Sequence, residues 1–171
     1  MLRNVARFHL RNRAGISLAL AALAALSVLS EGSRVLAQGA PRPEQLIKWR
    51  QSAFEVVAWN TQRLKSALAT DTAESPELQG AANALAAVAA SGLTDLFPRG
   101  TEHGKGWRET TAAAAVFSDA TQFRTRSDEF ARDAALLAKL AAGTDRAAIR
   151  DQFAKVTKAC KGCHDKFRET D

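Results

Sequence analysis

The chain has 171 residues, the length of a single domain. Hydrophobic residues make up 46% of it and charged residues 25%, a globular composition that excludes a disordered chain. Glycine (10 residues) and proline (4 residues) are scarce, tyrosine is absent and alanine runs are frequent, so strand-favouring residues are few. The composition predicts an all-α protein.

The net charge of +6 is concentrated at the N-terminus. The first 37 residues carry five arginines and one acid, and the remainder holds 19 basic and 17 acidic side chains. So small an excess argues against a nucleic-acid-binding protein.

The N-terminal segment itself has the pattern of a secretory signal. A basic stretch precedes an apolar stretch of 14 residues at 16–29, and small residues then allow cleavage after Ala37 or, as a second choice, Ala40. We therefore predict a signal peptide over residues 1–37 (or 1–40) and a periplasmic mature domain over 38–171, without a membrane attachment. An uncleaved anchor is the alternative, although the apolar stretch is shorter than the roughly 20 residues that span a bilayer.

The first helix of the mature chain is predicted after Pro43, running to about Ala69. Its apolar residues repeat at helical spacing along one face, and they are Ile47, Phe54, Val57, Leu64 and Leu68. Thr61 belongs to the same stripe and completes its steps of three and four. Arg50 falls within this stripe, where burying a charge is costly unless an anion pairs with it. The sequence therefore predicts either that Arg50 binds an anionic group or that its side chain extends to solvent at the helix end.

A second helix is predicted from near Pro76, with Ser75 as its N-cap. Its inner face carries Leu78, Leu85, Val88 and Leu96. The following residues 97–106 are rich in glycine and proline, which predicts a long loop at the rim of a site.

Two further helices complete the chain. The third is predicted from Ser118, as its cap, to Ala142, and the fourth is predicted to be capped by Thr144. The inner face of the fourth carries Ile149, Phe153, Val156, Cys160, Cys163 and Phe167. Four helices with short connections predict an up-down-up-down four-helix bundle.

Residues 160–164 read Cys-Lys-Gly-Cys-His, the attachment signature of c-type haem. A spacing of three residues on a helix brings both sulfurs to one face, where each can form a thioether, and His164 offers an imidazole to the iron. A thiol redox pair is one alternative, but such motifs usually open a helix beside a sheet. A zinc site is another, but no second ligand pair completes it. The motif therefore predicts one covalently attached haem c.

The remaining composition limits the sixth iron ligand. The only methionine is Met1, tyrosine is absent, and His103 lies in the glycine-rich loop, where we expect it to be exposed. We therefore predict a five-coordinate, high-spin iron with an open distal face that binds nitric oxide and carbon monoxide. Phe54 is the candidate for the distal wall, and a plain core phenylalanine is the alternative.

These residues resemble cytochrome c′, the class II family of c-type cytochromes. The resemblance covers about residues 41–169, and it rests on the block 160–168 (CKGCHDKFR), the block 49–54 (WRQSAF) and, with a departure at Pro98 and Arg99, the loop 97–102 (FPRGTE). It implies that Arg50 and Gln51 bind the haem propionates and that Phe54 covers the distal face.

The same resemblance implies that Arg168 lies near the proximal histidine, and that Thr101 and Glu102 touch the haem edge. It also implies a homodimer formed through the first two helices.

The sequence thus predicts a periplasmic gas-binding haem protein, capable of one-electron transfer, and not an enzyme. An enzyme would need a distal acid–base group, and only His103 could supply one as a histidine. A dedicated low-spin electron carrier of the same fold is the alternative, and its redox partner is not indicated.

Overall fold

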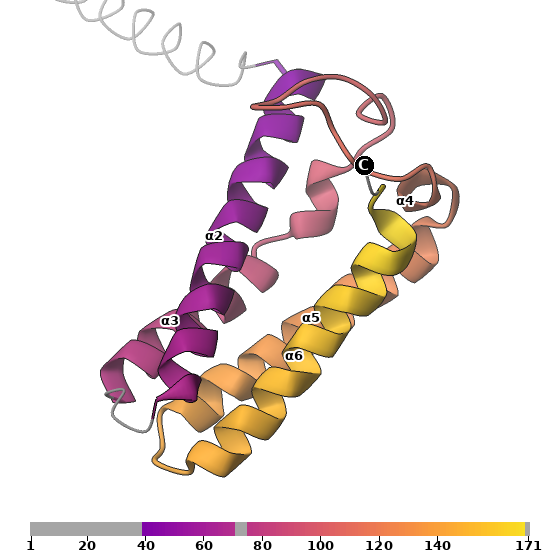
Figure 1. Ribbon diagram of the computed structural model, residues 1–171. Coiled ribbons are helices and arrows are strands. Elements are labelled where there is room, and N and C mark those ends of the chain that lie inside the picture. The colour runs from indigo at the N-terminus through magenta and orange to yellow at the C-terminus, as the bar shows by residue number, and fades with distance from the viewer. Residues whose placement is uncertain (1–38, 71–74, 170–171) are drawn as a thin grey trace, which may run out of the picture. The chain divides into compact units, whose positions relative to one another are not determined.

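Four long helices form the fold in the computed structural model, which describes residues 39–70 and 75–169 (Figure 1). The elements, in chain order, are α2 (Pro43–Ala69), α3 (Ser75–Ala89), the 3-10 helix η1 (Leu93–Leu96), α4 (Ala115–Ser118), α5 (Ala120–Ala141) and α6 (Arg146–Phe167). Successive long helices run in opposite directions, α3 packs on α2 and α5, and α5 also packs on α6. The prediction of an all-α four-helix bundle is confirmed. The predicted signal peptide lies outside the described residues.

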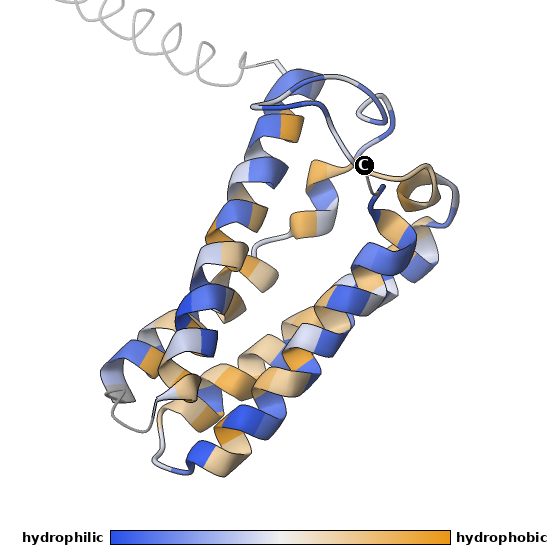
Figure 2. Cartoon of the chain, viewed as in Figure 1, coloured by the Kyte–Doolittle hydropathy of each residue, from blue (hydrophilic) through white to orange (hydrophobic). Residues whose placement is uncertain are grey.

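The core consists of two clusters that fill different parts of the bundle. The larger one joins all four long helices through fully buried aliphatic side chains such as Leu64, Leu85, Leu137 and Val156. The smaller one contains Val116, Phe123 and Phe167. Figure 2 shows the corresponding pattern, with hydrophobic positions on the inward sides of the helices. Burying each large aliphatic side chain contributes about 1.5–3 kcal/mol, so the larger cluster holds the helices together.

The predicted caps of the third and fourth helices are each wrong by one residue. Asp119 caps α5 by accepting a hydrogen bond from the Gln122 amide, and Asp145 caps α6 by accepting one from the Ala148 amide. The Ser118 hydroxyl instead donates to the carbonyl of Ala114, within the short helix α4. Both aspartates follow a residue that is also a good cap, so propensity alone does not choose between neighbours. The side chain of Ser75 is not among those described.

The second helix is shorter than its apolar pattern suggests. Helix α3 ends at Ala89, and the chain then turns through Gly92, whose φ of 81° favours glycine, into η1. Leu96 therefore faces the core from η1 rather than from a continuous helix, where it is partly buried against the larger cluster. After this turn, the next loop lies over the N-terminal half of α2. Gly106 of this loop is so close to the helix that an added Cβ would lie 2.8 Å from the Lys48 amide nitrogen.

Candidate haem site

The two cysteines lie on the inward side of α6, between the two core clusters. Both side chains are half-buried free thiols, Cys160 against the larger cluster and Cys163 against the smaller one. Burial raises the pKa of both thiols, and the neighbouring Cys160 adds to the increase at Cys163 while Arg126 opposes it. The helical spacing therefore presents two adjacent sulfurs at one place along the bundle.

His164 follows the second cysteine, and its side chain is partly exposed to solvent. Partial burial and the nearby Arg168 guanidinium lower the pKa of the imidazole, while Asp165 opposes them. Asp165 is itself paired with Lys161, at 2.6 Å. The environment thus favours the neutral imidazole, the form that can ligate a metal.

Arg168 ends α6 and joins it to the long loop between η1 and α4. Its backbone forms an isolated antiparallel bridge with Ala112. On either side of the bridge, the Ala113 amide donates to Phe167 (3.0 Å) and the Glu169 amide donates to Thr111 (2.9 Å). The helix end that follows His164 is therefore fixed to the loop.

Arg50 is buried and binds the same loop from α2. One guanidinium nitrogen donates to the Leu96 carbonyl (3.2 Å) and the Thr101 hydroxyl (2.8 Å), and the other donates to the Thr101 carbonyl (2.8 Å) and the Thr110 hydroxyl (2.6 Å). All four acceptors are neutral. Burial lowers the pKa of Arg50 to about 10, against the opposing effect of Glu102, so the side chain remains a cation at neutral pH. A buried cation with neutral partners is a candidate site for an anionic group.

Gln51, the next residue, holds the far part of the loop. Its side-chain oxygen accepts from the Trp107 amide (2.7 Å), and its side-chain nitrogen donates to the Arg108 carbonyl (2.9 Å). The loop approaches so closely that a Cβ at Gly106 would lie 2.8 Å from the Lys48 amide nitrogen. Arg50 and Gln51, which are neighbours on α2, therefore both fix the position of the loop by hydrogen bonds.

Phe54 lies one turn further along α2 and is 37% exposed, so it is not an ordinary core phenylalanine. Its ring meets that of Phe97 edge-on, with 6.4 Å between centroids. Phe97 in turn contacts Phe123 (5.0 Å), and Phe123 contacts Phe167 (5.3 Å). A series of rings thus connects α2 to the end of α6, three residues beyond His164.

The sequence does not predict Phe97 or Phe123 as site residues. Phe97 is predicted only as the start of a loop, although its position directly after the apolar pattern of the second helix is a usable signal. Phe123 is buried in α5 and contacts Phe97 and Phe167.

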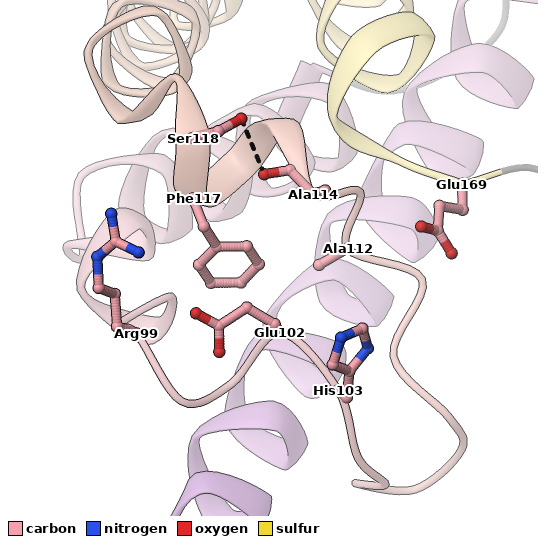
Figure 3. Close-up of a pocket in the computed structure, with 8 residues that line it drawn as sticks. All are labelled: Arg99, Glu102, His103, Ala112, Ala114, Phe117, Ser118 and Glu169. Carbon is pink, nitrogen blue, oxygen red and sulfur yellow. Dashed lines mark hydrogen bonds between the residues drawn. The ribbon is translucent and has the colours of Figure 1, made fainter.

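Thr101 and Glu102 lie in the loop, with different surroundings. Thr101 is fully buried and is held by Arg50, whereas the Glu102 carboxylate accepts from the Gly100 amide (2.6 Å). Glu102 and the exposed His103 line a pocket of about 250 Å³ (Figure 3), together with Arg99, Ala112, Ala114, Phe117, Ser118 and Glu169. Neither cysteine, nor His164, nor Phe54 lines it, so this pocket is separate from the C-x-x-C-H motif.

The helices α2 and α6 are joined at the end opposite the motif. Arg146 donates to the carbonyls of Ala67 and Thr70, and Arg150 donates to that of Leu68, so two side chains at the start of α6 bind the last turn of α2. In Figure 1 the ribbons of α2 and α6 separate towards the other end. By sequence position, Arg50 and Phe54 belong to the N-terminal half of α2, and Cys163 and His164 to the last turns of α6. The candidate residues are thus distributed over two helices that face each other.

In the described part of the chain, no helix is both long and apolar enough to span a membrane. Over the same residues, no three histidine, cysteine, aspartate or glutamate side chains gather in a position to hold a metal ion.

The family model for cytochrome c′ matches residues 45–168, which is most of the chain. The chain belongs to the cytochrome c′ family. It is 45% identical over 130 residues to cytochrome c′ of Rhodocyclus tenuis, covering 76% of this chain and 98% of the relative.

Solved structures of the family agree with the fold. One is a cytochrome c′ with an unusual ligand-controlled dimer dissociation; it has a TM-score of 0.73, is 31% identical and covers 77% of this chain and 100% of its own. Another is a nitric oxide complex of a variant of cytochrome c prime from Alcaligenes xylosoxidans, with a TM-score of 0.69 and 25% identity, covering 78% of this chain and 100% of its own.

Members of this family carry one covalently attached haem c, so this chain is a haem c protein. The residues present fit that group. Two adjacent thiols face inwards, and a largely neutral imidazole follows them. Among the described contacts, neither a hydrogen bond nor an ion pair holds the His164 side chain. A buried cation on the facing helix suits the carboxylates of the porphyrin.

Proposed function

We propose that this cytochrome c′ binds nitric oxide and carbon monoxide at an open distal position of its haem, and that it also transfers single electrons. Cys160 and Cys163 hold the haem by thioethers. Each thiol adds across one vinyl double bond, with the sulfur bonding to one carbon and the hydrogen to the other, so the addition needs no oxidant. His164 supplies the proximal ligand.

The observation that carries this proposal is that few side chains could serve as a second axial ligand to the iron. Residues 38–171 contain neither methionine nor tyrosine, and their one histidine besides His164 is His103. His103 is exposed in the loop pocket, which neither cysteine lines. The haem then supplies an iron with one open position, where a diatomic gas can bind.

The distal wall favours gases that need no hydrogen bond. Phe54 offers an apolar ring and belongs to neither of the two buried core clusters. Bound dioxygen gains from a distal hydrogen-bond donor, whereas nitric oxide binds ferrous iron tightly without one. The nitric oxide complex of the Alcaligenes relative supports the same ligand for this chain.

The propionates are the anionic groups expected at Arg50 and Gln51. The support is the buried Arg50 guanidinium, whose described hydrogen bonds all go to neutral oxygens. Thr101 and Glu102 then lie at the haem edge through their links to Arg50 and Gly100. Arg168 acts on the proximal side, because burial and, next to it, the Arg168 guanidinium lower the pKa of His164.

We further propose a homodimer formed through α2 and α3. Besides its inward face, α2 carries a second stripe of large apolar residues, spaced by seven and then three positions, that are exposed: Trp49 at 45%, Val56 at 42% and Trp59 at 62%. Such spacing is typical of a helix packed on another helix. A second copy of the chain presents the same stripe, which suits a two-fold interface.

The function implies export, since c-type haem is normally attached outside the cytoplasm. We therefore place the mature protein in the periplasm, after cleavage at Ala37 or Ala40. The role that fits best is nitric oxide sequestration, without turnover of a substrate.

The test uses the purified holoprotein. Its denatured mass should exceed that of residues 38–171 by one haem, its ferric spectrum should be high-spin, and carbon monoxide and nitric oxide should each shift the ferrous spectrum. His164→Ala should keep the added mass and change the ferrous spectrum. A six-coordinate low-spin spectrum in both oxidation states would favour the dedicated electron carrier instead, and a mass without the adduct would leave a thiol or zinc protein.

A further inference from the structure

Phe97 contacts both the residue proposed to cover the distal side of the haem and a residue proposed to bind its propionates. Its ring lies edge-on to Phe54, the distal candidate, and the Arg50 guanidinium lies over it at 4.5 Å from the ring centroid. On its other side it meets Phe123 at 5.0 Å. Phe97 therefore connects the distal side chain to the propionate side chain and to the core.

The backbone around Phe97 is firmly held. The preceding carbonyl, of Leu96, accepts from Arg50, and the Phe97 amide donates to the Thr94 carbonyl at 3.2 Å. The following carbonyl, of Pro98, accepts from the Thr101 hydroxyl at 2.8 Å. Three consecutive residues are thus fixed, so the Phe97 ring has a well-defined position.

Phe54 depends on Phe97 for its aromatic contact. Among the described ring contacts, the one aromatic neighbour of Phe54 is Phe97. A phenylalanine side chain exchanges between rotamers unless a neighbour restricts it. The fixed ring of Phe97 is the neighbour in place to do so.

We infer that Phe97 is a positioning residue that sets where the Phe54 ring stands, and thereby how fast a diatomic ligand reaches the iron. This inference rests on the proposed function, because it requires an open distal site covered by Phe54. Phe97 itself acts through Phe54 and through no contact with the ligand.

The test is a double-mutant cycle on the ferrous holoprotein, with carbon monoxide as the probe and its association rate measured by stopped flow. Phe97→Leu removes the ring contact and should raise the rate by roughly two- to tenfold, the range that an aromatic pair represents as a barrier difference. In a Phe54→Ala background the same substitution should change the rate by less than about 1.5-fold, because no Phe54 ring is left to position.

Two further variants separate positioning from general stability. Phe130→Leu is a matched control, since Phe130 is also a buried phenylalanine but belongs to the larger core cluster; it should leave the rate unchanged. Phe97→Met also removes the ring but supplies a longer and more flexible apolar side chain, so it should behave as Phe97→Leu does and serves if the leucine variant folds poorly.

A second readout does not depend on the rate. In ¹³C-phenylalanine spectra of the diamagnetic ferrous carbon monoxide form, the Phe54 resonance, identified by its loss in Phe54→Ala, should shift in Phe97→Leu and stay in place in Phe130→Leu.

An unchanged rate in both Phe97 variants, or an equal acceleration with and without Phe54, would overturn the inference while leaving the proposed function intact. A parent protein that binds no carbon monoxide would overturn both.

Discussion

The guanidinium of Arg50 donates to both oxygen atoms of Thr101, at 2.8 Å each, and both residues are buried. Arg50→Gln breaks this pairing and leaves buried carbonyls without a donor, so we expect the free energy of unfolding to fall by about 2–3 kcal/mol. If Arg50 stands beside the propionates, loss of its charge also lowers the reduction potential, since a nearby cation favours the reduced haem. Urea unfolding followed by circular dichroism and a redox titration measure the two effects. Arg99→Gln, in the exposed part of the loop, is the control and should change neither.

Gly106 packs directly on the backbone of α2. An added Cβ would lie 2.8 Å from the Lys48 amide nitrogen and 3.0 Å from the Ile47 carbonyl carbon, and neither atom can move without shifting the helix. Gly106→Ala should therefore reduce the free energy of unfolding by about 1–3 kcal/mol. Gly80→Ala, within α3 and with open space around it, should instead increase it by about 0.5–1 kcal/mol. Equal effects from the two substitutions would contradict the described packing of the loop.

Phe54 should limit ligand entry if it covers the iron. Phe54→Ala clears the distal face, and we expect the carbon monoxide association rate to rise at least about tenfold, equivalent to about 1.4 kcal/mol of barrier. Flash photolysis of the ferrous complex gives the rate. Trp59→Ala removes an exposed ring from the outer stripe of the same helix and should have no such effect. A rate that Phe54→Ala leaves unaltered would show that Phe54 does not cover the iron.

The outer stripe of α2 should govern self-association. Val56→Arg places a charge in its centre, and burying that charge without a partner should weaken the dimer by about 2–5 kcal/mol. Sedimentation velocity over a concentration series would report the shift towards monomer. Leu136→Arg is the matched control, because Leu136 is a similarly exposed aliphatic residue on α5, at 44%. Equal dimer stability in the parent and in Val56→Arg would rule out this surface as the interface.

The ion pair between Asp119 and Lys166 joins the start of α5 to the end of α6, at 2.6 Å. The Lys166 ammonium, with a hydrogen bond from the Gln122 amide, holds the pKa of Asp119 below its ordinary value. A lowered folded-state pKa stabilises the fold above the unfolded-state pKa of about 4, and this stabilisation is lost as the pH falls through the folded-state value. Asn is also a good cap, so Asp119→Asn removes the charge alone and should flatten the acid limb of stability below about pH 4.

Urea midpoints at pH 6, 4 and 3 measure that slope. The effect should be absent when Asp119→Asn is made in a Lys166→Gln background, since the partner charge is already gone. A slope unaffected by Asp119→Asn would show that the pair contributes nothing to acid stability.

The sequence predicted the bundle and the position of the cysteines because both depend on local periodicity. Cys160 and Cys163 continue the inward stripe of α6, and both are half-buried as that stripe requires. Helix ends were less accurate, since Ser118 and Asp119, or Thr144 and Asp145, are neighbouring caps whose choice depends on tertiary packing.

The loop contacts could not be predicted at all. No periodicity in the sequence indicates the hydrogen bond between Gln51 and Trp107 or the ring contact between Phe97 and Phe54, because each joins residues more than 40 positions apart. The exposed stripe of α2 is not predictable for a different reason. Its residues do repeat at helical spacing, but the inward face of the same helix already accounts for an amphipathic pattern.

All three tryptophans lie near the surface: Trp49 and Trp59 on α2, and Trp107 in the loop, the last 65% exposed with its indole donating to Ser52. Since the chain has no tyrosine, they are its main intrinsic fluorophores. The haem quenches indole emission by energy transfer, so this emission reports how far the outer side of α2 and the loop over its N-terminal half stand from the haem. A fluorescence melt therefore follows detachment of the loop and of α2 from the haem, and comparing it with an ellipticity melt would show whether that detachment precedes collapse of the bundle.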